Sequence, residues 1–255
     1  MKVLVSDFDG VICNGLLEYF YSSKLVYQKI WQTREINWQL LQEKFNILRP
    51  VVETGWEMPL LLRTLIDEGE TVDNILNHWQ VIREKAIKTI EKEGITIKTL
   101  IKTLDEVRQK QIEENLQNWL NLHSFYEGII PHIKKLINEG IKIYIVTTKS
   151  ETFTRKLLEK QEIFLPSVAI IGKEAKCPKY ETIRSIIDIE KVNPQEVYFI
   201  EDRLEALELV YQQSDLQSVK LFLASWGYNT DYVRKKAKNL SHIQLLSLDK
   251  WRNLK

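Results

Sequence analysis

The sequence has few glycines, prolines and cysteines, no excess of either charge and no long hydrophobic run. It contains 9 glycines and 6 prolines among 255 residues, about half the usual share, which indicates few turns and many helices. Its 36 basic and 35 acidic residues leave a net charge of +1, so neither a disordered chain nor a nucleic-acid partner is expected. Cys13 and Cys177 alone cannot form a disulfide framework or a four-ligand zinc site.

The hydrophobic segments are short along the whole chain. Near the N-terminus only Val3–Val5 precede Ser6 and Asp7, and a run of that length is too short for a signal peptide or a membrane span. Low cysteine content is typical of a reducing compartment. We therefore expect a cytoplasmic protein without a membrane partner.

The segments that favour β-strands are short, nearly continuous apolar runs. They are separated by stretches of helical length, a pattern typical of parallel strands buried on both faces. The sequence predicts an α/β fold, a doubly wound and mostly parallel Rossmann-like sheet with helices on both faces. The predicted strands are Val3–Ser6, Ile141–Thr147, Val168–Ile171, Val197–Ile200, Val219–Ala224 and Ile243–Leu246.

A helical segment separates the first predicted strand from the second. Apolar residues recur at spacings of three and four within Trp38–Leu48 and Ile75–Ile90, as in amphipathic helices. Thr71 can cap the second of these helices and Thr96 can begin another. The resulting prediction is an α/β core of residues 1–14 and 123–255, with an all-helical domain of residues 15–122 inserted into it.

Two acidic residues follow the first predicted strand. Asp7 and Asp9 stand two residues apart, so on an extended chain their side chains point the same way unless the chain turns at Gly10. Open α/β sheets bind ligands at the carboxyl ends of their strands. One acid of such a pair can be a nucleophile and metal ligand while the other carries a proton. A polar strand end that caps the next helix is the structural alternative.

Other predicted strands also end in polar side chains. Thr147 and Thr148 end the second strand, and Glu201 and Asp202 follow the fourth. Carboxylates from different strands suit Mg²⁺, which prefers oxygen ligands and keeps some waters. A lysine is needed to offset the negative charge, and the candidates are Lys176 and Lys179.

Taken in order, these motifs resemble those of the haloacid dehalogenase superfamily, whose members are mostly phosphatases. Asp7-Phe8-Asp9-Gly10 is similar to its first motif, Ile143–Thr148 to its second, and Phe199-Ile200-Glu201-Asp202 to its fourth. Lys179 resembles the lysine of the third motif better than Lys176, because it begins a predicted helix 23 residues before Asp202. The inserted helices are similar to the cap of phosphoglycolate-phosphatase-like members.

The resemblance implies a Mg²⁺-dependent phosphatase that acts on a phosphate monoester of a small metabolite. Asp7 would attack phosphorus and form an aspartyl-phosphate. Asp9 would protonate the leaving alcohol and then activate water. Asp7, the backbone carbonyl of Asp9, and either Glu201 or Asp202 would hold the ion.

The resemblance also implies which groups bind the substrate. Thr147 and Lys179 would bind the phosphoryl group, next to Gly10 and Thr148. Caps of this type place substrate-reading loops between helices, and the segment 49–55 interrupts the helical pattern with a proline and a glycine. Its charged residues, Arg49 and Glu53, are the candidates for substrate contact, with a plain turn between helices as the alternative.

Two other functions stay open. Phosphosugar mutases keep the same first motif, so phosphoryl transfer between sugar hydroxyls is one alternative. A non-catalytic binding protein that uses its Trp-rich cap as a contact surface is the other. Displacement of halide is not expected, because family members that perform it lack a carboxylate at the place of Asp9.

Overall fold

The computed structural model describes residues 1–31 and 35–254 and divides into two compact units. Met1–Asn14 together with Ser124–Lys255 form one unit, called here the sheet unit, and Gly15–His123 form the other, called the helical unit. Among the described residues, no helix combines the length and the apolar character needed to cross a membrane.

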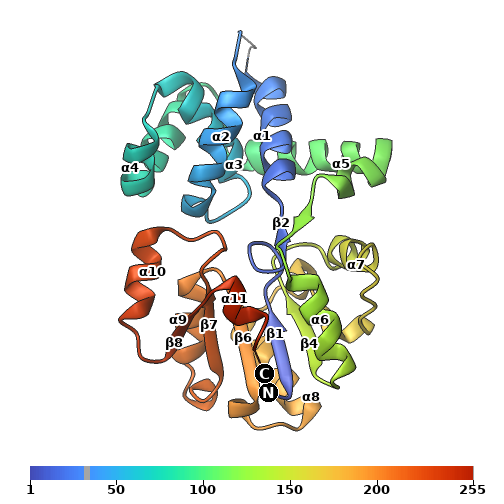
Figure 1. The fold of residues 1–255 in the computed structure, drawn as a ribbon. Coiled ribbons are helices and arrows are strands. Elements are labelled where there is room, and N and C mark those ends of the chain that lie inside the picture. The colour runs from blue at the N-terminus through green and yellow to red at the C-terminus, as the bar shows by residue number, and fades with distance from the viewer. Residues whose placement is uncertain (32–34, 255) are drawn as a thin grey trace. The chain divides into compact units, whose positions relative to one another are not determined.

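A six-stranded parallel sheet organises the sheet unit, with the strand order β5-β4-β1-β6-β7-β8 (Figure 1). A separate antiparallel pair, β2 and β3, lies outside this sheet. The strands are β1 (Val3–Ser6), β2 (Cys13–Asn14), β3 (Ser124–Phe125), β4 (Lys142–Val146), β5 (Ile170–Ile171), β6 (Val197–Glu201), β7 (Lys220–Ala224) and β8 (Ile243–Leu246).

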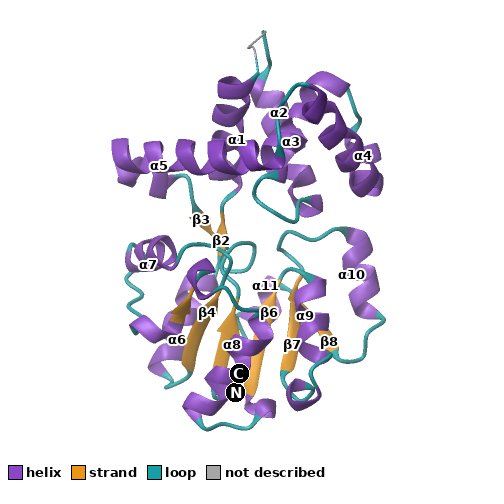
Figure 2. Cartoon of the chain, turned by 180° about the vertical axis from the view of Figure 1, so that it is seen from behind, coloured by secondary structure: helices purple, strands orange, loops and turns teal. Residues whose placement is uncertain are grey.

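Helices cover both faces of this sheet (Figures 1 and 2). The α8 and α9 helices pack against the face that carries Val3 and Val5, where Ile183 and Leu207 join the same buried cluster. The α6 and α11 helices lie on the other face. The helices of this unit are α6 (Ile129–Asn138), α7 (Glu151–Glu159), α8 (Lys179–Glu190), α9 (Leu204–Tyr211), α10 (Asp231–Lys238) and α11 (Leu248–Trp251).

The predicted α/β fold class is confirmed, with two corrections to its strands. The strand expected over Val168–Ile171 is shorter, because Ser167–Ala169 forms a 3₁₀ turn after Pro166 and only Ile170–Ile171 pair with β4. The β2–β3 pair was not predicted, since two residues per strand are too few to show an alternating pattern.

The register of the central strands brings their carboxyl ends to one level. Ser6 of β1 is paired with Ile145 of β4 on one side and with Ile200 of β6 on the other. The chain order reverses around β1, and in open α/β sheets ligands bind at such a reversal. Residues that follow these three strands therefore meet at one edge of the sheet.

The helical unit consists of five α-helices with short 3₁₀ and π turns in its described residues. Thr71 caps the fourth helix by accepting the N–H of Asn74 at 3.2 Å, and Thr96 caps the fifth together with Thr99, as the sequence predicts. Two helices of this unit, Leu16–Ile30 and Glu57–Arg63, are not among the segments for which helical spacing is named above. The helices are α1 (Leu16–Ile30), α2 (Trp38–Leu48), α3 (Glu57–Arg63), α4 (Val72–Lys92) and α5 (Ile97–Asn121).

Candidate active site

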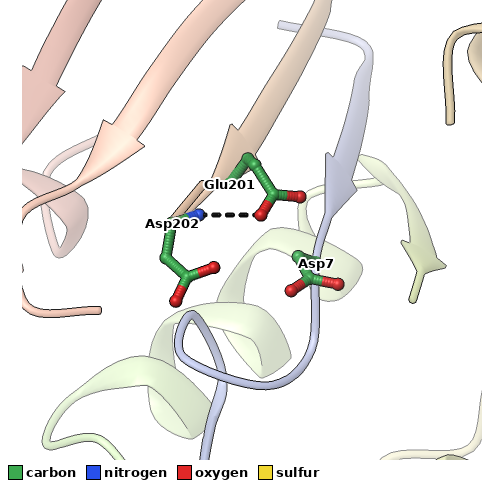
Figure 3. A group of neighbouring side chains, drawn as sticks. All are labelled: Asp7, Glu201 and Asp202. Carbon is green, nitrogen blue, oxygen red and sulfur yellow. Dashed lines mark hydrogen bonds between the residues drawn. The ribbon is translucent and has the colours of Figure 1, made fainter. Parts of the chain in front are cut away.

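Three buried carboxylates meet at the carboxyl ends of β1 and β6 (Figure 3). Asp7 follows β1, Glu201 is the last residue of β6 and Asp202 follows it. Each of the three offers one oxygen, and these oxygens lie within 4.8 Å of one another. The parallel register causes this convergence, because it aligns the ends of strands that are far apart in sequence.

Lys179 stands at the start of α8 and joins two of these acids. Its Nζ donates to Oδ1 of Asp7 at 2.7 Å and to Oε2 of Glu201 at 2.6 Å. Of the two candidate lysines, Lys179 is therefore the one that contacts these acids. Lys176 is exposed in the turn before α8.

The two carboxylates that share Lys179 are poorly solvated. Burial raises the pKa of Asp7 to about 7, although Lys179 lowers it, and the nearby charge of Glu201 adds to the rise. Burial likewise raises the pKa of Glu201 to about 7, against the lowering effect of Lys179. Burial alone would lower the pKa of Lys179, but its two acidic partners raise it above its ordinary value. One ammonium thus only partly offsets the negative charge, which favours a further cation.

The two oxygens of Glu201 already accept several hydrogen bonds. Its Oε1 accepts the backbone N–H groups of Asp202 at 3.1 Å and Arg203 at 3.0 Å, and the first of these is drawn in Figure 3. Its Oε2 accepts the ammonium of Lys179. Glu201 therefore anchors the chain after β6 and the lysine together.

Asp202 lies in a tight cradle formed by the loops after β1 and β7. The backbone N–H of Tyr228 donates to its Oδ2 at 2.7 Å, and Asn229 Nδ2 donates to its carbonyl oxygen at 3.0 Å. Gly10 has φ +84°, and a Cβ atom there would come within 2.0 Å of Asp202 Oδ2. A Cβ at Gly227 would come within 2.3 Å of Asp202 Cβ. Only glycine fits at these two places without moving the carboxylate.

Among the described residues, the Asp9 carboxylate is not part of the group of acids within 4.8 Å of one another, and it contacts Lys149. The ammonium of Lys149 is 3.3 and 3.4 Å from the two carboxylate oxygens of Asp9. Thr147 is buried after β4, and its Oγ1 accepts the backbone N–H of Lys149 at 3.1 Å. Thr148 is exposed. The chain bends at Phe8 and turns over residues 10–12, and Asp7 and Asp9 contact different lysines.

Three residues of this site escaped the sequence reasoning. Lys149, Tyr228 and Asn229 bind its acidic residues, yet none stands directly at the end of an apolar run. For Lys149 the available signal is its place two residues beyond the predicted strand end at Thr147. For the other two it is the glycine at position 227, three residues after β7.

The two predicted substrate contacts, Arg49 and Glu53, belong to the helical unit. Arg49 Nη1 donates to the carbonyl of Val52 at 3.0 Å, and Glu53 Oε2 lies 3.5 Å from Arg83. Buried Glu57 accepts the Thr54 hydroxyl at 2.9 Å and so ties this segment to α3. Their predicted substrate contact stays a prediction.

Comparison with known proteins gives a family match and several structures of similar fold. The family model for haloacid dehalogenase-like hydrolases matches residues 1–208. No curated protein matches the sequence significantly.

Three solved structures of similar fold cover nearly the whole chain. A haloacid dehalogenase-like family protein from Streptococcus pneumoniae has a TM-score of 0.60 at 11% identity, covering 96% of this chain and 93% of that chain. A predicted phosphatase from Clostridium acetobutylicum has a TM-score of 0.56 at 15% identity, covering 99% of this chain and 96% of that chain. A predicted phosphoglycolate phosphatase from Haemophilus somnus has a TM-score of 0.56 at 14% identity, covering 91% of this chain and 88% of that chain. At these identities the likeness concerns the fold.

Proposed function

The chain belongs to the haloacid dehalogenase-like hydrolase family, and from that premise we propose that it is a Mg²⁺-dependent phosphatase. Its substrate is a phosphate monoester of a small metabolite. The observation that carries the proposal is the arrangement of Asp7, Lys179 and two further acids at the ends of adjacent strands. A carboxylate nucleophile, a phosphate-binding cation and a divalent-ion site are the parts that phosphoryl transfer requires.

The donor set fits Mg²⁺, because it consists of carboxylate oxygens within 4.8 Å of one another and this ion prefers such ligands. We assign Asp7, Asp202 and the backbone carbonyl of Asp9 as its protein ligands. Glu201 is assigned a supporting role, because both of its oxygens accept hydrogen bonds from the chain itself. The bound ion would screen the repulsion between the Asp7 carboxylate and the phosphate.

Asp7 serves as the nucleophile. Its carboxylate oxygen forms a bond to phosphorus while the bond from phosphorus to the ester oxygen breaks, and the leaving oxygen takes that electron pair. Lys179, 2.7 Å from Oδ1 of Asp7, holds the carboxylate in place and supplies positive charge to the phosphoryl oxygens. Thr147 donates its hydroxyl to the same group, with Gly10 and Thr148 beside it.

Asp9 moves the protons. It gives a proton to the leaving oxygen in the first step and takes one from the water that hydrolyses the aspartyl-phosphate in the second. Positioned acids and bases of this kind contribute about 10²–10⁴-fold to a rate. In the helical unit, Arg49 and Glu53 are the proposed contacts with the rest of the substrate.

Release of inorganic phosphate from a panel of small phosphate monoesters, with and without Mg²⁺, tests this proposal. We expect turnover that requires Mg²⁺ and is lost in Asp7→Asn, while Asp215→Asn, which changes an exposed acid paired with Arg184, keeps it. Turnover that persists in Asp7→Asn contradicts the assigned nucleophile. Transfer of phosphate between sugar hydroxyls without release to water would instead indicate a mutase.

A further inference from the structure

Lys149 connects two of the proposed catalytic residues, and neither the sequence motifs nor the family match accounts for it. We infer that Lys149 is a positioning residue that holds Asp9 for proton transfer to the leaving group. The inference rests on the proposed phosphatase reaction and adds a residue to it.

The contact between Lys149 and Asp9 is close and shielded from water. The Lys149 ammonium lies 3.3 Å from one carboxylate oxygen of Asp9 and 3.4 Å from the other. The two side chains are only 11% and 19% exposed, so solvent and salt screen their attraction less than that of a surface pair. Within residues 1–31 and 35–254, Lys149 is the one side chain that hydrogen bonds the Asp9 carboxylate. It therefore fixes the orientation of that group.

The backbone of Lys149 is held on both sides, which fixes where its side chain begins. Its N–H donates to Thr147 Oγ1 at 3.1 Å, and its carbonyl oxygen accepts the N–H of Lys173 at 3.0 Å. A Cβ atom at Gly172 would come within 2.8 Å of that carbonyl oxygen, so the two loops pack closely. The same residue thus binds Thr147 through its backbone N–H and Asp9, which follows β1, through its side chain.

The charge of Lys149 suits the first chemical step. As the ester bond breaks and Asp7 bonds to phosphorus, Asp9 gives its proton to the leaving oxygen and changes from neutral to anionic. The Lys149 ammonium stabilises the carboxylate that this transfer leaves on Asp9, and it keeps the carboxyl group in one place while the proton moves. Lys179 contacts Asp7 and Glu201, so the two lysines serve different carboxylates.

The dependence of rate on the leaving group tests this role. A p-nitrophenolate leaves without needing a proton, whereas an alkoxide needs one, so only the alkyl ester depends fully on Asp9. The experiment compares kcat/KM, which reports the transfer to Asp7, for p-nitrophenyl phosphate and glycerol phosphate with Mg²⁺. We expect Lys149→Met to reduce kcat/KM for the alkyl ester about 10- to 100-fold more than for the aryl ester. Lys149→Arg, which keeps the positive charge, should retain most of the kcat/KM for the alkyl ester.

The control variant is Lys142→Met, which removes an exposed lysine at the other end of β4 and should lower neither value. If Lys149→Met does not fold, Lys149→Gln replaces it in the comparison of the two esters. An equal loss on both esters, or no loss on either, overturns the role of Lys149 and leaves the proposed phosphatase standing. A wild-type protein that hydrolyses neither ester nor any member of the monoester panel refutes the proposed function itself.

Discussion

Substitution of Gly10 by alanine should damage the fold and the proposed ion site together. Gly10 has φ +84°, and an added Cβ atom would lie 2.0 Å from Oδ2 of Asp202 and 2.9 Å from the ring of Tyr228. Because contacts below 3.0 Å are essentially never seen for Cβ atoms, the Asp202 carboxylate must retreat by about 1 Å. That movement breaks the 2.7 Å hydrogen bond that it accepts from the Tyr228 N–H.

The expected loss of stability is the sum of a backbone and a contact contribution. An L-residue in the left-handed region costs about 1–2 kcal/mol, and a hydrogen bond to a charged group contributes about 1.5–3 kcal/mol. Gly10→Ala should therefore lower the free energy of unfolding by about 2.5–5 kcal/mol. Movement of Asp202 should also weaken Mg²⁺ binding by about 10–100-fold, the usual effect of disturbing the support of a metal ligand.

Gly140→Ala is the matched control for this prediction. Gly140 has φ +81°, and a Cβ atom there meets nothing within 4 Å, so only the backbone cost of about 1–2 kcal/mol applies. Urea unfolding measures the stabilities, and calorimetric titration with Mg²⁺ measures the affinities. Equal destabilisation of the two variants, or wild-type Mg²⁺ affinity in Gly10→Ala, would refute the reasoning from Asp202.

Two further predictions concern buried charge and pH. Arg108 binds the fully buried Glu18 carboxylate through Nε at 2.7 Å and Nη2 at 2.8 Å. Because Arg108→Met leaves this buried charge without its partner, it should reduce the free energy of urea unfolding by about 3–5 kcal/mol. A loss below about 1 kcal/mol would contradict this. Burial, with a smaller effect of Lys135, lowers the pKa of His132, which packs on Trp251. The unfolded chain then binds more protons than the folded one as pH falls through about 6.5, so stability should fall there. In unfolding experiments at several pH values, His132→Leu should reduce the dependence of the free energy of unfolding on pH. An unchanged pH dependence would exclude His132 as its source.

Most of the sheet could be predicted from sequence because its physical signal is local. The runs at Val3–Ser6 and Val197–Ile200 are apolar on both faces, and the structure has β1 and β6 at these places. The hydrolase class that the four motifs implied agrees with the family match. Helix α1 carries a weaker signal, since its buried residues include Glu18, Ser22 and Ser23, which do not appear as an apolar stripe.

The parts of the site that sequence reasoning missed depend on contacts between distant segments. Lys149 contacts Asp9 across 140 positions, and Tyr228 reaches Asp202 through its backbone N–H, which every residue except proline possesses. Spacing favours Lys179 over Lys176, whereas the contacts of Lys179 with Asp7 and Glu201 depend on how α8 begins beside β1 and β6. Strand register and the packing of loops determine these contacts, and a short sequence motif predicts neither of them.

In the proposed mechanism, Asp7 becomes phosphorylated during turnover. The most direct measurement quenches the protein with acid while it turns over a phosphate monoester in Mg²⁺, reduces it with borohydride and maps the product by peptide mass spectrometry. Borohydride reduces an aspartyl-phosphate to homoserine, so we expect homoserine at position 7 in the wild-type protein. Continued turnover with unmodified aspartate at position 7, or modification at a different carboxylate, would contradict it.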